Sequence, residues 1–291
     1  QGYVPALIVS KPDKPKGRGL KLLPTEVSQF AQDKNIHLIK PVSLNNSDVG
    51  RILSKERADF FIVADYGEII PKNLLVIPKI FPLCFHPSLL PRYRGPAPIE
   101  AVLMNGEKKS GVTVFKMNQK VDAGDIISQK ELTVGYEDDF FSLSQRLARK
   151  GALLLIETVD KIRAKDYFLA PQDENLATLT YKLNKESGRI LWSNKAQDIR
   201  NLIRATVDWP SAYTYYRGAA VKILVADIVD REASFLPGTI IDIDKEGIQV
   251  AAGKGALKIK KLKPQGKSEM PAWSFVCGYR VKAGELFSSD K

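Results

Sequence analysis

The chain has 291 residues, a length that suits one large domain or, more in keeping with ordinary domain sizes, two. Hydrophobic residues make up 44% of it, enough for a sizeable core, and no apolar run approaches the roughly 18 residues that a membrane-spanning helix needs. Cys84 and Cys277 lie far apart without metal-ligand spacing. These features fit a reducing compartment, the cytoplasm, better than a disulfide scaffold, and an organelle stays open as an alternative.

The formal net charge is +11, and it is unevenly distributed. Residues 1–179 carry a net charge of +4, whereas the shorter stretch 180–291 carries +7. A basic C-terminal part suggests a polyanionic partner, with nucleic acid first. A solubilising surface explains the same charge equally well, so both interpretations stay open.

The first part of the chain alternates between short apolar runs and amphipathic segments. This alternation predicts an α/β fold with a doubly wound, mostly parallel sheet. The expected strands are 4–10, 37–40, 59–64, 80–86, 111–117 and 126–132, and the expected helices are 25–35, 48–56, 71–75, 98–105 and 138–165. The continuous apolar run 59–64 predicts a strand buried on both faces. Thr25, Asp138 and Asp139 are expected helix caps.

The pattern weakens over residues 167–183, which we interpret as a linker between domains 1–166 and 184–291. After it, one helix is expected at 196–204. Short strands separated by turn signals follow, and this spacing predicts a small β-barrel or sandwich. These strands are expected at 221–229, 238–244, 247–252 and 256–261.

His86 is one of only two histidines, and it stands where the expected strand 80–86 ends. The loop that follows, residues 87–98, contains four prolines and a glycine, which break helix and strand alike. Ligands bind at strand ends of open α/β sheets, and histidine titrates near neutrality. His86 is therefore a candidate proton carrier. A partly buried, hydrogen-bonded structural histidine is the alternative.

The run Val121-Asp122-Ala123-Gly124-Asp125 supplies two carboxylates on either side of a glycine. A carboxylate beside an imidazole fixes its tautomer and stabilises the imidazolium, so Asp122 is the candidate partner of His86. An aspartate that caps its own turn is an equally ordinary interpretation, because this is common before glycine.

The segment 11–21 is a basic loop rich in proline and glycine, with Lys14, Lys16, Arg18 and Lys21 among its cations. We interpret it either as a solvated loop or as an insertion that contacts phosphates. It lacks the phosphate-loop pattern, no glycine-rich dinucleotide fingerprint follows a strand, and no histidine–cysteine cluster suggests a metal.

Several segments resemble the formyltransferase family that uses 10-formyltetrahydrofolate, in its branch that acts on methionyl-tRNA. The resemblance spans nearly the whole chain, in order. The segments that carry it are His86–Gly95, Asp122–Asp125, Pro12–Gly19, Ala64–Pro71, Gly188–Trp192 and Asp208–Tyr213.

This resemblance implies a Rossmann-like catalytic domain followed by an OB-like barrel that helps to hold tRNA. It implies a monomeric enzyme without metal that transfers a formyl group from 10-formyltetrahydrofolate to the α-amine of initiator methionyl-tRNA. His86 and Asp122 would be catalytic, with Cys84 at a third catalytic position. The implied folate-binding residues are Tyr66, Gly67, Ser88, Leu89, Leu90, Pro91 and Asp125. The implied tRNA-binding residues are Lys14, Lys16, Arg18, Lys21, Arg92 and Arg94.

The chain departs from the family pattern in two places. The family normally begins with a strand, a glycine-containing turn and a helix that are absent before residue 4 here, so we expect a longer natural chain. The family also has asparagine where this chain has Cys84. A thiol is a weaker hydrogen-bond donor than an amide, so this change weakens the expected stabilisation of an oxyanion.

Two other functions are compatible with the sequence. An enzyme of the same fold could formylate an amino-sugar nucleotide, although the basic loop 11–21 argues against so small an acceptor. The chain could instead be an inactive tRNA- or folate-binding protein, because Cys84 replaces the expected asparagine.

Overall fold

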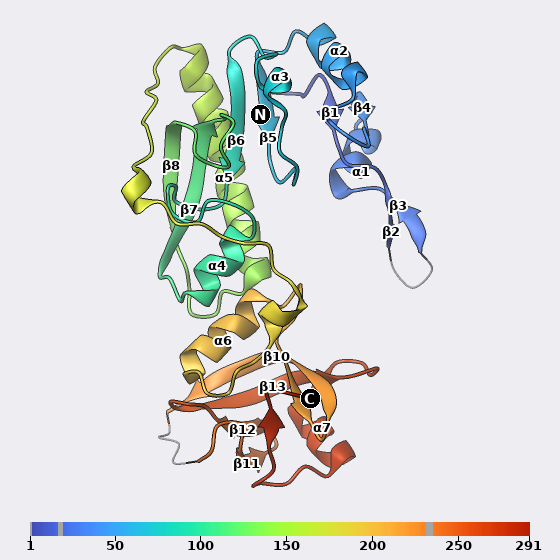
Figure 1. Cartoon of the computed structure of the whole chain (residues 1–291), viewed down its shortest axis with the longest axis vertical. Coiled ribbons are helices and arrows are strands. Elements are labelled where there is room, and N and C mark those ends of the chain that lie inside the picture. The colour runs from blue at the N-terminus through green and yellow to red at the C-terminus, as the bar shows by residue number, and fades with distance from the viewer. Residues whose placement is uncertain (1, 17–19, 231–234) are drawn as a thin grey trace. The chain divides into compact units, whose positions relative to one another are not determined.

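The computed structural model describes residues 2–16, 20–230 and 235–291, and Figure 1 labels the elements along the chain. The chain divides into two compact units. One comprises Gln1–His86, Thr113–Gln129 and Leu153–Ala177, and the other comprises Pro87–Val112, Lys130–Ala152 and Thr178–Lys291. Strands β7 (Lys109–Lys116) and β8 (Ile126–Thr133) and helix α5 (Phe140–Arg163) each continue from one unit into the other.

A four-stranded sheet in the order β5-β6-β7-β8 carries the candidate site. Strands β5 (Phe60–Val63) and β6 (Phe81–His86) are parallel, and β7 is antiparallel to β6. The prediction that β5 is buried on both faces is wrong, because Ile62 is 45% exposed. The reason is that β5 forms the edge of this sheet and pairs on one side only, with β6, so side chains of one strand instead of two flank Ile62.

The first residues form a second, two-stranded parallel sheet from β1 (Ile8–Val9) and β4 (Leu38–Ile39). Both strands are shorter than predicted. Helices α1 (Glu26–Asp33), α2 (Ser47–Lys55) and α3 (Lys72–Leu75) accompany them. Thr25 caps α1 as predicted, since its hydroxyl accepts the backbone N–H of Ser28 at 3.0 Å. The expected Rossmann-like alternation of strands and helices is therefore confirmed.

The basic segment 11–21 contains a hairpin that its sequence did not predict. Strand β2 (Lys14–Lys16) pairs antiparallel with β3 (Lys21–Leu23). The side chains of Lys14 and Lys21 are exposed, while Arg18 lies outside the described residues. The hairpin thus presents cations on an extended backbone.

Helix α5 is the longest helix, with 24 residues, and it begins where the sequence predicted. The carboxylate of Asp139 accepts the backbone N–H of Ser142 at 2.8 Å. Asp138 accepts the N–H of Gly135 at 2.6 Å and is paired with Arg146, and these contacts lower the pKa of its carboxyl despite its burial. No helix in the described part of the chain is both long enough and apolar enough to cross a membrane.

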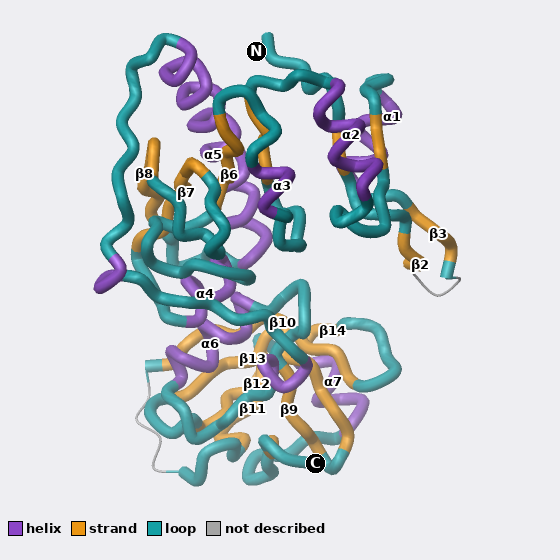
Figure 2. The backbone as a smooth tube through the Cα atoms, turned by 45° about the horizontal axis from the view of Figure 1, so that its top comes forward, coloured by secondary structure: helices purple, strands orange, loops and turns teal. Residues whose placement is uncertain are grey.

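The C-terminal part is a seven-stranded antiparallel sheet that curls into an OB-like half-barrel, as predicted (Figure 2). Register shifts beside Val225 mark a bulge in its longest strand, and bulges bend sheets in this way. Its strands are β9 (Tyr213–Tyr216), β10 (Ala219–Val229), β11 (Ile240–Asp244), β12 (Gly247–Ala251), β13 (Ala256–Pro264), β14 (Met270–Pro271) and β15 (Phe287–Ser288).

Two helices accompany this sheet. Helix α6 (Ala196–Ala205) was predicted, but α7 (Ala272–Tyr279) was not. The sequence of α7 is rich in aromatic residues and includes a glycine, so local propensity gives little helix signal. Burial explains it instead, because Phe275 is fully buried in the core beside Tyr216 and Tyr279.

Helix α6 is fastened to the turn that precedes α5, within the second unit. The guanidinium of Arg200 lies 3.7 Å from the ring centre of Tyr136 and donates to the Tyr136 carbonyl at 3.0 Å. Arg204 donates to the carbonyls of Gly135 and Asp138. Burial and the neighbouring charge of Arg200 lower the pKa of Arg204. Two cations of the basic C-terminal part therefore have structural partners.

The carboxylate of Glu285 is expected to make the stability of the barrel depend on pH. It accepts hydrogen bonds from Arg217, from the Tyr216 hydroxyl at 2.7 Å and from the Lys282 N–H at 2.8 Å. These contacts lower the pKa of Glu285 from 4.5 to about 2. Its stabilisation is present above pH 4.5 and is lost as the pH falls toward 2.

We predict that Glu285→Gln lowers the free energy of unfolding more at pH 6 than at pH 3. At pH 3 the unfolded wild-type chain binds a proton at Glu285 that the folded chain does not, and this reduces the stabilisation by the carboxylate. Urea unfolding of both proteins at several pH values measures this difference. A difference between the two proteins that stays constant with pH would contradict the assignment.

Candidate active site

His86 ends strand β6, where its backbone pairs with Thr113 of β7. The residue is only 6% exposed. Because side chains alternate across a strand, Cys84 and His86 lie on the same face of the sheet. The sequence prediction that a titratable group stands at the end of this strand is therefore confirmed in position.

The carboxylate of Asp122 faces this histidine. Its Oδ2 lies 3.5 Å from Nδ1 of His86, and both side chains are largely buried. Asp122 sits in the turn between β7 and β8, with a backbone φ of +48° in the left-handed region. Non-glycine residues rarely adopt this conformation, and it costs energy that surrounding contacts must supply.

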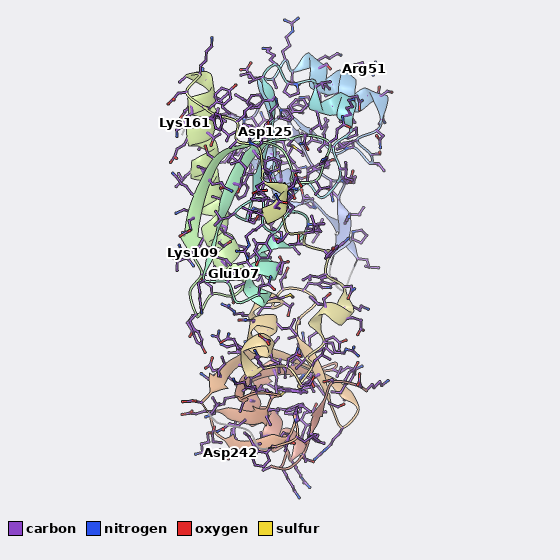
Figure 3. All side chains as sticks on the ribbon, turned by 60° about the vertical axis from the view of Figure 1, so that its left-hand side comes forward. Arg51, Glu107, Lys109, Asp125, Lys161 and Asp242 are labelled. Carbon is purple, nitrogen blue, oxygen red and sulfur yellow. The ribbon has the colours of Figure 1, made fainter. Side chains whose placement is uncertain are left out.

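Close packing against β7 fixes that turn. A Cβ on Gly124 would lie 1.7 Å from the carbonyl oxygen of Lys116, so no larger residue fits. The Lys116 N–H donates to the Asp125 carbonyl at 2.9 Å. Asp125 directly precedes β8, and Figure 3 labels it there. Its backbone thus helps to hold the turn.

Two side chains that the sequence did not single out complete the turn. The amide of Gln172 donates to the carbonyls of Asp122, at 2.9 Å, and Gly124, at 2.7 Å. Asn118 donates to the carbonyl of Ala123 at 3.1 Å. Gln172 lies in the segment interpreted as a linker, and nothing in that segment indicated a contact with residues 50 positions away.

Cys84 is 8% exposed, and its thiol donates a long hydrogen bond of 3.6 Å to the Phe85 carbonyl. Burial, with a smaller effect from the charge of Asp122, raises the thiol pKa to about 12. A thiol with this pKa is neutral near pH 7, and the neutral form is a poor nucleophile. The geometry therefore argues against a covalent role for Cys84.

The loop after His86 is held by its own buried groups. The hydroxyl of Ser88 is fully buried and donates to the Arg92 carbonyl at 2.7 Å, and Leu90 is buried too. Leu89 and Pro91 are partly exposed. Of these four predicted folate contacts, Ser88 and Leu90 thus shape the loop, while Leu89 and Pro91 remain accessible.

The other predicted folate residues, Tyr66 and Gly67, lie in the turn after β5. Lys11 stands over both: its Nζ is 6.0 Å from the Tyr66 ring centre and 2.8 Å from where a Cβ on Gly67 would be. Burial, and secondarily the charge of Glu68, raises the pKa of the Tyr66 hydroxyl. This tyrosine therefore stays protonated at neutral pH.

The two arginines of the loop differ in exposure. Arg92 is exposed and paired with Glu107, whereas Arg94 is only 5% exposed. The backbone of Arg94 donates to the Thr178 carbonyl at 2.8 Å and accepts from the Thr180 N–H at 2.7 Å. Burial makes Arg94 a poor candidate for the tRNA contact that the sequence suggested, and Arg92 the better one.

Among the described residues, no three or more His, Cys, Asp or Glu side chains are grouped so that they could hold a metal ion. The Asp122 carboxylate lies beside His86, and Cys84 lies on the same face of the strand. This is an arrangement for proton transfer beside a strand end.

Comparison with known proteins identifies the family. A family model described as "Formyl transferase" matches residues 2–159, and one described as "Formyl transferase, C-terminal domain" matches residues 182–280. The chain belongs to the formyl transferase family. It is 39% identical to a methionyl-tRNA formyltransferase of Sulfurihydrogenibium sp. and 41% identical to one of Dictyoglomus thermophilum. Each match covers 96% of this chain and 91% of the relative.

Solved structures show the same fold at greater distance. HypX from Aquifex aeolicus in complex with tetrahydrofolic acid matches with a TM-score of 0.65 and 18% identity, over 96% of this chain and 48% of that one. WlaRD, a sugar 3N-formyl transferase, matches with a TM-score of 0.64 and 16% identity, over 92% of this chain and all of that one. At these identities the likeness concerns the fold alone.

The two cysteines should differ sharply in reactivity. Cys277 is exposed, whereas the Cys84 thiol is buried with a pKa of about 12. We predict that the folded protein reacts rapidly at one thiol with a chromogenic disulfide at pH 8, and at two thiols after denaturation. Cys277→Ser should abolish the rapid reaction. Rapid labelling of Cys84 in the folded protein would contradict the assigned burial.

Proposed function

We propose that this protein transfers the formyl group of 10-formyltetrahydrofolate to the α-amine of methionine on charged initiator tRNA. The observation that carries the proposal is the His86–Asp122 pair at a strand end, in a chain whose near full-length relatives are methionyl-tRNA formyltransferases. The exposed cations of the β2–β3 hairpin and the basic C-terminal part suit a polyanionic acceptor. The proposed setting is the cytoplasm, with the protein acting as a monomer.

In the proposed reaction the amine attacks the formyl carbon, and a tetrahedral intermediate forms and collapses as N10 of the folate leaves. The amine must lose a proton and N10 must gain one. Asp122 lies on the Nδ1 side of His86, so it favours the imidazole tautomer whose Nε2 accepts a proton. We assign proton transfer to His86 and its orientation to Asp122.

We assign substrate binding to two sets of residues. Tyr66, Gly67, Leu89, Pro91 and Asp125 would contact the folate, with Ser88 and Leu90 shaping the loop. Lys14, Lys16, Arg18, Lys21 and Arg92 would contact tRNA phosphates, whereas buried Arg94 holds the loop.

The thiol at position 84 favours a second candidate function, that of an inactive protein that binds tRNA or folate. The neutral Cys84 thiol already donates weakly to the Phe85 carbonyl, so it offers an oxyanion less than an amide would. Formylation of charged initiator tRNA by the purified protein decides between the two. Binding of tRNA without formylation would favour the inactive protein, and preference for an amino-sugar nucleotide would favour a different acceptor.

We predict that His86→Ala lowers kcat for formyl transfer by at least about 10²-fold, because the proton carrier is lost. Folate affinity, measured by equilibrium titration, should stay nearly unchanged. The matched control is His37→Ala, since the side chain of His37 is exposed and its ion-pair partner is Glu56, outside the proposed site. Near-normal turnover by His86→Ala would refute the assignment.

We predict that Cys84→Asn raises kcat, by up to about 10²-fold, the contribution that a single oxyanion donor can make. Asparagine is larger than cysteine, so a thermal melt must accompany the kinetics. A folded Cys84→Asn protein with lower turnover would show that the thiol has a role of its own.

We predict that Gln172→Ala lowers kcat by about 10- to 100-fold, because small displacements of a catalytic group are this costly. KM for tRNA should change little, since Gln172 acts through the Asp122 turn. Gln29→Ala is the control, because Gln29 makes its hydrogen bond on the surface with Asp33. A rise in KM with unchanged kcat would argue against a positioning role.

A further inference from the structure

A cavity of about 360 Å³ lies in the second unit, between helix α4 (Pro98–Met104) and the segment 178–183. Its size falls in the lower part of the roughly 300–1,000 Å³ range of small-molecule sites. Ala97, Ala101 and Met104, spaced three and four residues apart, line one wall. Leu179, Tyr181 and Leu183 line the other. The small side chains of Ala97, just before the helix, and Ala101, within it, leave the space open.

The second wall is firmly attached to the loop that follows His86. Thr178 donates its N–H to the Pro91 carbonyl at 3.2 Å, and Thr180 donates to the Arg94 carbonyl at 2.7 Å. A Cβ on Gly95 would lie 2.9 Å from the Thr180 carbonyl, so the two backbones are in close contact. The cavity is therefore formed before any ligand arrives.

The chemistry of the cavity suits a nucleobase. Tyr181 is 77% exposed although it is large and aromatic, and Arg92 is the only charged side chain among the described residues that line the cavity. Asn105, also at the cavity, uses one amide proton on the Tyr93 hydroxyl at 3.0 Å, and its carbonyl oxygen accepts no hydrogen bond from the described residues. Aromatic rings stack on bases, arginine attracts phosphates, and amides pair with base edges.

We propose that this cavity binds one of the unpaired 3′ nucleotides of the charged tRNA, with its base stacked on Tyr181. The proposal rests on the function proposed above and names a contact outside the His86 site. Glu107 and Lys109, labelled in Figure 3 at the start of β7, lie outside the cavity lining. Glu107 therefore anchors Arg92 without placing a negative charge in the cavity.

The test uses initiator methionyl-tRNA in which each unpaired 3′ nucleotide in turn is replaced by the fluorescent base 2-aminopurine. Stacking quenches this fluorophore, so binding to the wild-type protein should quench one position. Tyr181→Phe should retain the quenching, and Tyr181→Ala should lose it. Because this readout requires binding only, it does not depend on formyl transfer.

Kinetics supply the second readout. Tyr181→Ala should raise KM for tRNA by about 5- to 150-fold, the range that loss of one base stack produces, with kcat little changed. Ala101→Leu, which fills the cavity with a good helix former, should act in the same direction. Phe168→Ala is the matched control, because Phe168 is an aromatic residue of similar exposure, 73%, that does not line the cavity.

The outcomes separate this proposal from the one on which it rests. Absence of formylation by the wild-type protein, with Tyr181-dependent quenching retained, would refute the proposed function alone. Formylation with equal KM values for Tyr181→Ala and Phe168→Ala would overturn the cavity proposal alone. A third outcome would also overturn the cavity proposal. If Tyr181→Ala still raises KM for a tRNA with an abasic 3′ nucleotide, but no longer raises it when the tRNA carries alanine in place of methionine, the cavity holds the amino-acid side chain.

Discussion

The candidate site depends on the close approach of one turn to strand β7. The backbone of Gly124 passes so near the Lys116 carbonyl that only glycine fits there. This contact places Asp122, two residues earlier, 3.5 Å from His86 and holds it in a left-handed conformation. The energy that this conformation costs is offset by hydrogen bonds from Gln172 to the carbonyls on either side of Ala123. Geometry of the backbone, more than the charges themselves, thus creates the pair.

The sequence predicted the parts of this site that depend on local pattern. Residues two apart on a strand share a face, so the predicted strand alone indicates that Cys84 and His86 lie on the same face of the sheet. The prolines and glycine after His86 indicated an irregular loop for the same local reason. Gln172 could not be found in this way, because its contact joins segments about 50 residues apart and depends on how the chain folds back. The exposure of β5 was missed because apolar composition does not show whether a strand lies at a sheet edge.

The same distinction explains the C-terminal part. The bulged strand β10 and strands β11, β12 and β13 were visible as short runs between turn signals, whereas β9, β14 and β15 were not predicted. Together they form an OB-like half-barrel. Helix α7 was not visible, since it is stabilised by burial of Phe275 and not by local propensity. Net charge was likewise a coarse guide to nucleic-acid binding. Arg200 and Arg204 contribute to the positive charge of the C-terminal part, but they donate hydrogen bonds to backbone carbonyls of the turn before α5. Only the exposed cations bear on nucleic-acid binding.

Position 84 shows why family membership and catalytic competence are separate questions. Two family models and relatives near 40% identity show that the chain belongs to the formyl transferase family. The thiol at this position, neutral and turned to a neighbouring carbonyl, contributes little to an oxyanion. The His86–Asp122 pair can still move the proton, because proton transfer and oxyanion stabilisation are separate contributions to the same barrier. A slower enzyme, with acceptor binding preserved by surfaces away from position 84, is therefore the physically consistent expectation.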